Sequence, residues 1–310
     1  MEADTPADTP TCYRHPSFET HVRCTRCDRR ICPDCMREAA VGHQCPECVR
    51  EGNRSVRQAR SLFGGGVPSG TKPLVTYALI ALNVLAYVAE VVKPEILDRF
   101  GMLGAALTGP AGSQGSLYVY DGWTPPGFET TGVVGGEWYR LLTGAFLHLP
   151  PDSSIGVMHL VFNMLALWNL GRDVETQLGK VRYVALYLLS AVGSSVLVYV
   201  LAPDTNAVGA SGAIFGLAAA LYVIGRRLGR DVGSLNRFMA GFLVWMVLSA
   251  FFTSWQGHLG GLLTGGLVMY GLAYAPAKLR NGLAQSIAAV VLVVLLVLVV
   301  VWKTNALTGG

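Results

Sequence analysis

Charged residues are scarce in this chain of 310 residues: only 14% are Asp, Glu, Lys or Arg, whereas 52% are hydrophobic. An ordinary soluble domain carries about 25% charged residues. The few charges are also unevenly placed, because residues 1–60 hold 19 of them and the remaining 250 residues hold 25. This distribution excludes a single soluble domain. It indicates a short polar domain followed by a membrane-embedded body.

Clustered basic and aromatic residues are also missing. The formal net charge is only +4, and residues 1–60 contain ten basic residues against nine acidic ones. Their only aromatic residues are Tyr13 and Phe18. A nucleic-acid-binding face needs Lys and Arg gathered on one surface, so we expect no nucleic-acid partner.

Cysteine is absent from residues 49–310, because all seven cysteines lie between Cys12 and Cys48. An odd number leaves one cysteine over in any disulfide scheme, and disulfides need an oxidising compartment. The first residues, MEADTPADTP, have neither the basic nor the apolar segment of a signal peptide. We therefore expect a reducing, cytoplasmic environment, in which metal binding is favoured over disulfides.

The cysteines and one histidine form four pairs, each with two residues between its members. The pairs are Cys12/His15, Cys24/Cys27, Cys32/Cys35 and Cys45/Cys48. A two-residue gap brings both side chains to one ion, so eight ligands predict two structural Zn²⁺ sites with no open position for catalysis. His43 is an alternative to Cys45 as a ligand. The spacing resembles that of B-box-type zinc fingers, which implies that pairs one and three share one ion and pairs two and four the other.

Seven apolar stretches in the rest of the chain are long enough to cross a bilayer, which takes about 20 residues as a helix. They are roughly 73–92, 153–171, 183–202, 209–225, 238–254, 256–275 and 283–302. We therefore expect an all-α polytopic membrane protein. The stretch that begins at Gly209 is the shortest and the richest in small residues, so we expect it in the bundle interior. The long segment 93–152 shows little helical pattern.

Basic residues in alternate loops predict the orientation of these helices. The basic loops carry Arg172, Lys180 and Arg182, then Arg226, Arg227, Arg230 and Arg237, then Lys278 and Arg280. The loops 203–208 and 253–257 carry none. By the positive-inside rule the N-terminus is cytoplasmic, and the C-terminus and the 93–152 loop are extracellular, in a multi-pass protein of the cell membrane.

These observations divide the chain into four segments. They are a zinc-binding cytoplasmic domain at 1–48, a flexible Arg-, Ser- and Gly-rich linker at 49–72, a helical core at 73–275, and a final helix with its tail at 276–310. We expect the zinc-binding domain to be structural and either to bind a cytoplasmic protein partner or to gate access to the helical core.

Polar residues stand at the start of two of the apolar stretches. Ser211 lies between Gly209 and Gly212, and His258 opens a Gly-rich helix. Glycines let a ligand approach the serine hydroxyl closely, and a histidine in a membrane helix by default suggests a function. A nucleophile and a base are the minimum that a hydrolase needs. Helix packing alone is the alternative explanation of these residues.

A third stretch adds hydrogen-bond donors. His159 and Asn163 are four residues apart, so they share one helix face. Donors of this kind suit the oxyanion of a tetrahedral intermediate. Three polar sites, all expected in the outer half of the membrane, are hard to explain by packing.

Together these motifs resemble the rhomboid family of intramembrane serine proteases. The matching residues are Gly209-x-Ser211-Gly212, His258 with Gly261 and Gly265, His159-x3-Asn163, Gly171-x3-Glu175 and Glu137-x-Tyr139-Arg140. The resemblance covers about residues 73–275 and implies a six-helix core, to which 283–302 adds a seventh helix. Phe215 departs from the pattern, because some members carry a Tyr there that packs on the catalytic histidine. Tyr139 also departs, because the family favours Trp.

The resemblance implies that Ser211 is the nucleophile and His258 the general base of a dyad. It also implies an oxyanion hole made by His159, Asn163 and the Ser211 N–H. The expected activity is cleavage of transmembrane segments of other membrane proteins near the outer face, without a cofactor. The alternative is a catalytically inactive rhomboid-like adaptor that binds client transmembrane helices. A transporter would carry charged residues along a central pathway and would show inverted repeats in its sequence. Neither feature is seen, so a transporter is disfavoured.

The other polar residues of the apolar stretches are interpreted as helix–helix contacts. They are Asn83, Ser190, Ser194, Ser195 and Ser249. We expect His148 at the surface rather than at the entrance for the substrate, which is the alternative position.

Overall fold

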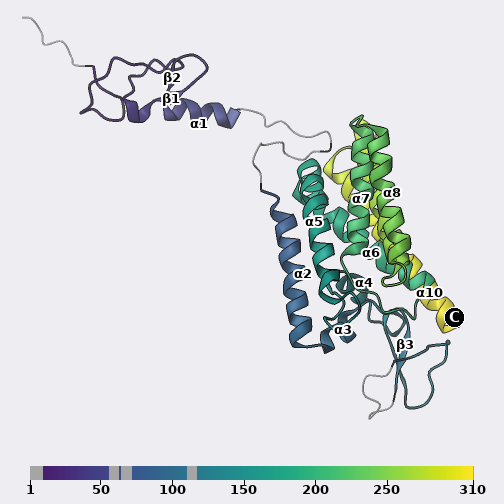
Figure 1. Ribbon diagram of the computed structural model, residues 1–310. Helices are drawn as coiled ribbons and strands as arrows, with labels where there is room; N and C mark the ends of the chain where they lie inside the picture. The colour runs from purple at the N-terminus through teal and green to yellow at the C-terminus, as the bar shows by residue number, and fades with distance from the viewer. Residues whose placement is uncertain (1–9, 56–62, 64–71, 110–116, 310) are drawn as a thin grey trace, which may run out of the picture. The chain divides into compact units, whose positions relative to one another are not determined.

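The computed structural model describes residues 10–55, 63, 72–109 and 117–309. The chain divides into two compact units, Met1–Ala59 and Arg60–Gly310 (Figure 1). Each unit has its own core, and they are considered separately below.

The first unit is small and rich in cysteine. Its elements are a 3₁₀ turn η1 (Pro33–Cys35), an antiparallel pair of strands β1 (Arg37–Glu38) and β2 (His43–Gln44), and helix α1 (Pro46–Ser55). Its core consists of Ile31 and six of the seven cysteines, and Cys27 is exposed. Helix α1 occupies the first part of the linker expected at 49–72. Most of the rest of that linker lies outside the described residues.

In the described residues, seven long helices make up the body of the second unit, and each overlaps one of the seven apolar stretches. They are α2 (Leu74–Val92), α5 (Gly156–Leu178), α6 (Lys180–Leu201), α7 (Ser211–Arg227), α8 (Val232–Ser249), α9 (Trp255–Tyr274) and α10 (Gly282–Thr308). The prediction of an all-α helical bundle is thereby confirmed. Helices α5 and α10 continue several residues beyond the expected ends. Helix α8 begins six residues before the expected start at 238 and ends five residues before the expected end at 254.

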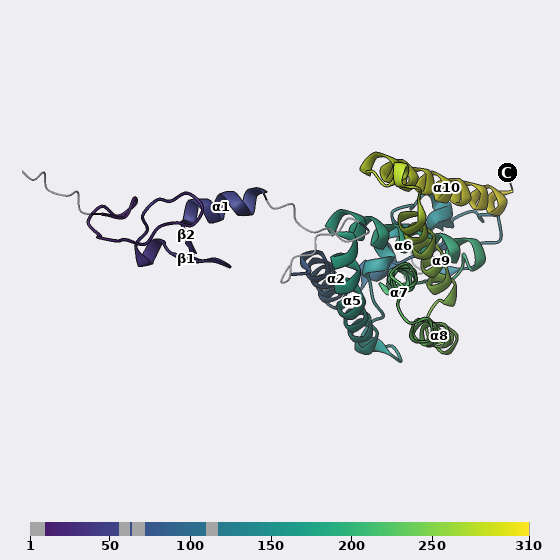
Figure 2. The same ribbon diagram turned by 90° about the horizontal axis from the view of Figure 1, so that it is seen from above.

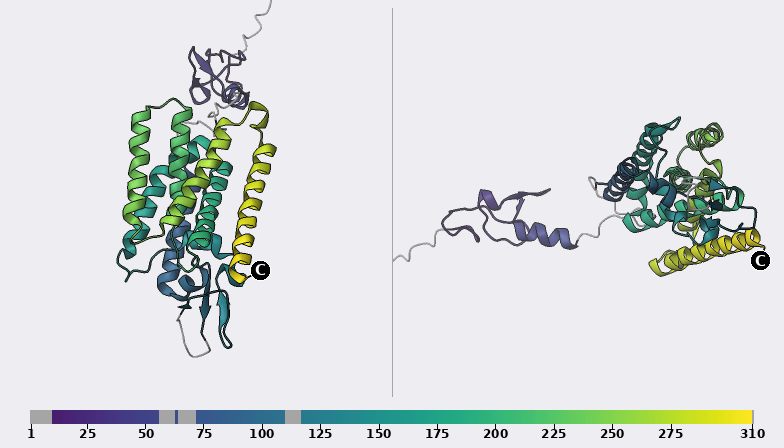
Figure 3. Two further views of the ribbon diagram at one scale, coloured as in Figure 1. Left: turned by 90° about the vertical axis from the view of Figure 1, so that its right-hand side faces the viewer. Right: turned by 90° about the horizontal axis from the view of Figure 1, so that it is seen from below.

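Helix α7 is the centre of this bundle. Seen from above, α5, α6, α8 and α9 surround it (Figure 2), and α7 packs against all four. Twelve of its 17 residues are buried, which confirms its expected interior position. Helix α2 packs on α5, and α10 packs on α6. Helices α8 and α10 lie at opposite edges of the bundle (Figure 3).

Only four of the seven helices are both long and apolar enough to span a membrane by length and composition: α2, α6, α8 and α10. Helices α5, α7 and α9 do not meet that test, although the sequence analysis treated all seven alike. The difference has a physical cause. Helix α7 has 17 residues, and α5 and α9 carry polar residues and glycines that the neighbouring helices bury.

The segment 93–152, expected to show little helical pattern, contains several short elements. They are α3 (Glu95–Phe100), β3 (Ala106–Thr108), β4 (Leu117–Tyr118), β5 (Glu129–Thr131), η2 (Val133–Gly135), α4 (Arg140–Thr143) and η3 (Gly144–Phe146). The strands form one antiparallel sheet in the order β4-β3-β5. A further 3₁₀ turn, η4 (Ala277–Leu279), precedes α10. Helix α3 and strand β3 lie at the same end of the bundle as the C-terminus of α10 (Figure 1).

A buried carboxylate ties the start of α2 to α5. Glu175 accepts hydrogen bonds from the backbone N–H groups of Val75 (3.1 Å) and Thr76 (2.9 Å) and from the Thr76 hydroxyl (2.9 Å). The first N–H groups of a helix have no partner inside the helix. Glu175 therefore caps α2 from another helix, and a carboxylate there also complements the helix dipole.

Glycines allow α7 and α9 to touch through their backbones. A Cβ atom on Gly261 would lie 1.8 Å from the carbonyl oxygen of Gly212, and one on Gly265 would lie 2.4 Å from the Cα of Gly216. No side chain fits at such distances, so these glycines set the spacing of the two helices. Small residues at such positions are typical of helix packing in membranes.

We predict that Gly261→Ala separates α7 from α9 and destabilises the protein, because the added methyl group meets backbone rather than a movable side chain. Overpacking of this kind costs about 1–3 kcal/mol or more. Thermal unfolding in detergent should show a clearly lowered midpoint. Gly271→Ala is the matched control on the same helix, because a Cβ there meets nothing within 4 Å. Equal midpoints for the two variants would refute the role of the glycine contact.

Candidate functional site

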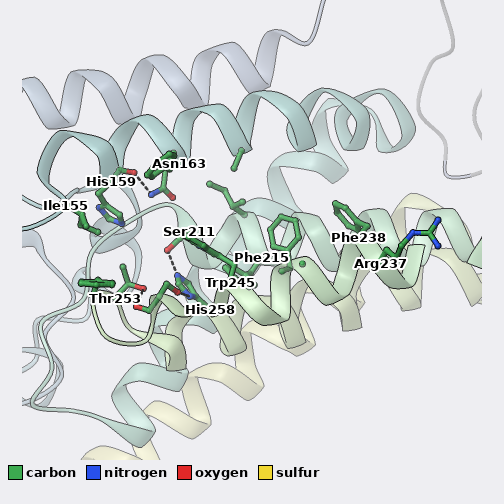
Figure 4. A pocket seen from close by; sticks show the side chains of 17 residues that line it. Ile155, His159, Asn163, Ser211, Phe215, Arg237, Phe238, Trp245, Thr253 and His258 are labelled. Atoms are coloured by element: carbon green, nitrogen blue, oxygen red, sulfur yellow. Dashed lines mark hydrogen bonds between the residues drawn. The ribbon is translucent and has the colours of Figure 1, made fainter. Parts of the chain in front are cut away.

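Ser211 and His258 face each other across the contact between α7 and α9. The Oγ of Ser211 lies 2.9 Å from the Nε2 of His258 (Figure 4), within hydrogen-bond distance. His258 is 2% exposed. The structure therefore brings together the two residues that the sequence analysis selected as nucleophile and base.

Both residues stand in the first turn of their helices. Ser211 is the first residue of α7, and His258 is the fourth residue of α9. The hydroxyl of Ser254 caps α9 by accepting a hydrogen bond from Gly257 N–H at 3.2 Å. Because the first backbone N–H groups of a helix are free of intrahelical partners, the Ser211 N–H is available to a ligand.

Two further contacts orient the imidazole of His258. Its ring stacks on Phe215, with the centroids 4.4 Å apart and the planes 13° from parallel. Phe215 thus retains an aromatic ring against His258, although it lacks the hydroxyl of the Tyr that the resemblance would place there. On the other edge, the Nδ1 of His258 lies 3.4 Å from the Oγ of Ser249. The sequence analysis interpreted Ser249 as a packing residue and missed this contact.

His159 and Asn163 lie on α5 and line the same cavity as the Ser211–His258 pair. The Nδ1 of His159 accepts a hydrogen bond from Leu149 N–H at 3.3 Å, so its Nε2 carries the ring proton. That Nε2 is buried without a protein partner among the described residues. The amide nitrogen of Asn163 donates to the His159 carbonyl at 2.7 Å and has a second N–H to offer. Two donors are therefore available near Ser211.

Gly209 keeps open the space between these donors and Ser211. A Cβ on Gly209 would lie 2.9 Å from the Nε2 of His159 and 3.5 Å from the Oγ of Ser211, and its φ of +128° suits only glycine. Its N–H donates to the carbonyl of Gly144 at 3.0 Å. Two residues earlier, Ala207 pairs with Met102 through two backbone hydrogen bonds of 2.8 and 3.0 Å. The 93–152 segment thus holds the approach to Ser211 in place.

A buried ion pair holds that segment together. Arg140, 3% exposed, donates to Glu137 at 2.6 Å and to the carbonyls of Asp98 (2.7 Å) and Gly101 (2.9 Å). Glu137 also accepts from Gly132 N–H at 2.7 Å. Burial alone would raise the pKa of the Glu137 carboxyl, but the hydrogen bonds from Arg140 and Gly132 N–H lower its pKa below the usual range.

A cavity of about 650 Å³ borders Ser211 and His258. Its walls come from α5, α7, α8, α9 and the loops beside them, and its aromatic lining residues are Phe162, Phe215, Phe238, Phe242, Trp245 and Phe252. Ser211, His258 and His159 gather at one end, whereas Phe238 and Arg237 line the other (Figure 4). An apolar cavity of this size with a few polar groups at one end is typical of a binding site.

His148 is not at the surface, so that expectation is wrong. Its ring is fully buried, edge-on to Tyr87 at 6.3 Å and tilted against His159 at 5.3 Å. Its backbone N–H donates to the buried Glu90 at 3.1 Å. The sequence analysis missed this burial because His148 lies in a loop between apolar stretches, and only the fold covers it.

The four metal-ligand pairs of the first unit form two groups. Cys12, His15, Cys32 and Cys35 make one group, and Cys24, Cys27, Cys45 and Cys48 the other; within each, the ligand atoms lie within 4.8 Å of one another. Pairs one and three thus meet, as do pairs two and four. His43 lies in β2, and neither group found in the described residues includes it.

Distances within the groups fit tetrahedral metal sites. Metal–sulfur bonds of about 2.3 Å place two sulfur ligands about 3.8 Å apart. The Sγ atoms of Cys27 and Cys45 are 3.7 Å apart, and the Sγ of Cys35 lies 3.5 Å from the Nδ1 of His15. Both groups could therefore hold a metal ion.

In the all-cysteine group, hydrogen-bond donors favour the thiolates of Cys24 and Cys27, whereas burial and the neighbouring thiols raise the pKa of Cys48 to about 12. Arg29 donates to the Sγ of Cys27 at 3.3 Å, and Cys45 N–H donates to the Sγ of Cys24 at 3.2 Å. Burial alone would raise the pKa of the Cys24 thiol, but backbone hydrogen bonds from Cys45, Cys27 and Arg26 lower it to about 6. A thiolate is the form that binds a metal ion.

Comparison with known proteins gives one consistent result. A model of the Rhomboid domain matches residues 135–276, which include α5 to α9. Rhomboid protease GluP of Bacillus subtilis (strain 168) is 32% identical over 206 residues, 63% of this chain and 34% of GluP. Putative rhomboid protease YdcA of the same organism is 34% identical over 144 residues, 45% of this chain and 69% of YdcA. Rhomboid protease AarA of Providencia stuartii is 25% identical over 264 residues, 74% of this chain and 84% of AarA. This chain thus spans about a third of the length of GluP.

Proposed function

The chain belongs to the rhomboid family, and from this premise we propose that it is an intramembrane serine endopeptidase whose dyad is Ser211 and His258. The observation that carries the proposal is the 2.9 Å contact between Ser211 Oγ and His258 Nε2 beside an apolar cavity. The substrates are transmembrane segments of other membrane proteins, because the cavity is lined by aromatic side chains and lies within a membrane-embedded bundle.

The proposed mechanism follows from the positions of these atoms. His258 Nε2 takes the proton of the Ser211 hydroxyl as Oγ attacks the carbonyl carbon of the substrate. The protonated His258 then gives this proton to the departing amine, which leaves an ester on Ser211. Water, activated by His258, hydrolyses the ester and restores Ser211. The substrate helix must unwind locally, since a helical peptide bond is shielded by its own hydrogen bonds.

The oxyanion of the tetrahedral intermediate is stabilised by His159 Nε2–H, the Ser211 N–H and the Asn163 amide. Support comes from the buried, unpartnered Nε2 of His159 and from the open space at Gly209. Donors fixed in a water-poor site stabilise a developing negative charge more than water does. This chemistry uses no cofactor.

The alternative function is a catalytically inactive adaptor that binds client transmembrane helices without cutting them. Loss of the serine or the histidine would mark such a protein, and here both are present within hydrogen-bond distance. The two functions are separated by the cleavage experiment below.

In the membrane we propose that the N-terminus is cytoplasmic, the C-terminus extracellular, and the dyad near the outer face of the cell membrane. The supporting observation is the alternation of basic loops. The site residues near the starts of α5, α7 and α9 gather at one end of the cavity (Figure 4), so they share one end of the bundle. A cytoplasmic protein would then be the partner of the first unit.

We propose that the two ligand groups of the first unit each hold a structural Zn²⁺ ion. The support is that one group offers three cysteines and a histidine, the other offers four cysteines, and the spacings in both fit tetrahedral coordination. The bound ions would cross-link a unit whose core is otherwise little more than Ile31.

The first prediction here concerns the dyad. Ser211→Ala and His258→Ala should each reduce cleavage of a reconstituted single-pass membrane substrate by at least about a thousandfold, because each removes one half of the proton-transfer pair. The double variant should lose little more, since the residues act as a unit. Asn163→Ala should be milder, about a hundredfold, because two oxyanion donors remain.

Ser190→Ala is the matched control, because Ser190 is a buried helix serine whose hydroxyl donates to Leu186 and touches neither dyad residue. It should retain cleavage. A fluorophosphonate probe should label the natural chain and not Ser211→Ala. Cleavage by Ser211→Ala at the natural rate would rule out the protease and leave the adaptor.

The second prediction concerns metal content. Elemental analysis of the purified full chain should find two zinc ions per chain, and Cys24→Ser should bind less. His21→Ala is the control and should keep both ions, because the exposed His21 belongs to neither ligand group. Chelation should unfold the first unit and leave the helical unit intact. A zinc content near zero, with all seven thiols reactive, would contradict the proposal.

The third prediction concerns orientation. A cysteine replacing the exposed Thr308 should react with a membrane-impermeant maleimide in intact cells, whereas one replacing the exposed Asn53 should react only after lysis. The natural chain gives the background from its own cysteines. The reverse labelling pattern would place the dyad at the cytoplasmic face.

A further inference from the structure

We infer that Ser249 is a positioning residue that holds His258 in the tautomer with its proton on Nδ1, which leaves Nε2 free to accept the proton of Ser211. This inference rests on the proposed protease function and deepens it. It is carried by three contacts of the Ser249 and His258 side chains.

The first step is the hydrogen-bond geometry of the Ser249 hydroxyl. Its Oγ lies 3.3 Å from the carbonyl oxygen of Met246 and 3.4 Å from the Nδ1 of His258. A hydroxyl has one hydrogen to donate and two lone pairs, whereas a carbonyl can only accept. In the arrangement that we infer, Ser249 donates to the Met246 carbonyl, which can only accept, and presents a lone pair to the Nδ1 of His258.

The second step concerns the ring proton of His258. A neutral imidazole carries one proton, and the nitrogen that faces an acceptor is the one that holds it. Ser249 thus keeps the proton on Nδ1, and Nε2 keeps its lone pair toward the Ser211 hydroxyl 2.9 Å away. With the opposite tautomer, Nε2–H would face Ser211 and could not take its proton.

The third step explains why the Ser249 hydroxyl is fixed. Ser249 is the last residue of α8 and is 3% exposed. Its carbonyl accepts hydrogen bonds from the N–H groups of Phe252 (2.9 Å) and Thr253 (2.8 Å) and from the Thr253 hydroxyl (3.0 Å). These bonds close the turn between α8 and α9, so the hydroxyl is presented by an ordered helix end.

No other described contact makes this choice of tautomer. Stacking on Phe215 restrains the plane of the His258 ring, but it acts equally on both nitrogens. The contact with Ser211 does not select a tautomer either, because the Ser211 hydroxyl can donate to an unprotonated Nε2 or accept from a protonated one. In Ser-His-Asp enzymes an acceptor on Nδ1 orients the base, and its loss leaves the wrong tautomer. Ser249 supplies a neutral acceptor at that position.

The test compares Ser249→Ala, Ser249→Thr and the control Ser190→Ala in the reconstituted full chain. We expect kcat of Ser249→Ala to fall about tenfold with KM little changed, as for the loss of one hydrogen bond of ordinary strength. Ser249→Thr retains the hydroxyl and should restore most of kcat. Ser190→Ala removes a buried hydroxyl elsewhere and should leave kcat unchanged.

Nitrogen NMR of histidine-labelled protein reads the tautomer without activity. His258 signals are assigned by difference with His258→Asn. In the natural chain and Ser249→Thr, Nδ1 should be protonated and Nε2 unprotonated, whereas in Ser249→Ala the two signals should move toward each other as tautomers mix.

The inference would be overturned if Ser249→Ala had the same kcat as the natural chain and the same two nitrogen signals for His258. Equal losses in Ser249→Ala and Ser249→Thr with unchanged spectra would show a packing role and would also overturn it. If the natural chain cleaves nothing, the proposed function fails instead, and the spectra still decide whether Ser249 sets the tautomer.

Discussion

The backbone contact between α7 and α9 is the constraint on which the candidate site depends. A Cβ on Gly261 would lie only 1.8 Å from the Gly212 carbonyl, so the two helices approach as closely as helices can. Ser211 precedes Gly212 directly, and His258 lies one turn before Gly261. The short distance between Ser211 and His258 is thus a consequence of helix packing. Two helices in backbone contact hold the Ser211 Oγ and the His258 Nε2 within hydrogen-bond distance.

A second consequence is a division of roles among the helices. The helices that carry Ser211, His258 and His159 are α7, α9 and α5, and none of them meets the length and hydropathy criteria for a membrane span. Of the four that do, α2, α6 and α8 pack against these helices, and α10 packs on α6. Polar groups are costly in lipid, so chemistry can reside in this bundle only where apolar helices surround it. Backbone N–H groups are also costly in lipid when they have no partner, and Glu175 supplies a partner for those at the start of α2.

Local patterns in the sequence predicted much of this structure, because they report on properties that act over a few residues. Apolar length predicted the seven helices, and two-residue spacing predicted the metal-ligand pairs. The contact of Ser249 with His258 and the burial of His148 could not be predicted that way. Several serines lie in the apolar stretches, and only the tertiary fold places Ser249 beside the Nδ1 of His258. The short elements of the 93–152 segment are likewise held by long-range bonds, such as those from Arg140 to the carbonyls of Asp98 and Gly101.

Helix α8 has two functions in this structure. It forms a wall of the cavity, and it carries Ser249, which lies beside the Nδ1 of His258. Its buried residues are Leu235 and Ser249, near its two ends, and the length between them is largely exposed or lines the cavity. Because Ser249 is the last residue of α8, the position of that helix end sets the distance between the Ser249 Oγ and the His258 Nδ1. Under the proposed function, a segment that binds in the cavity while the end of α8 stays in place meets a correctly oriented His258.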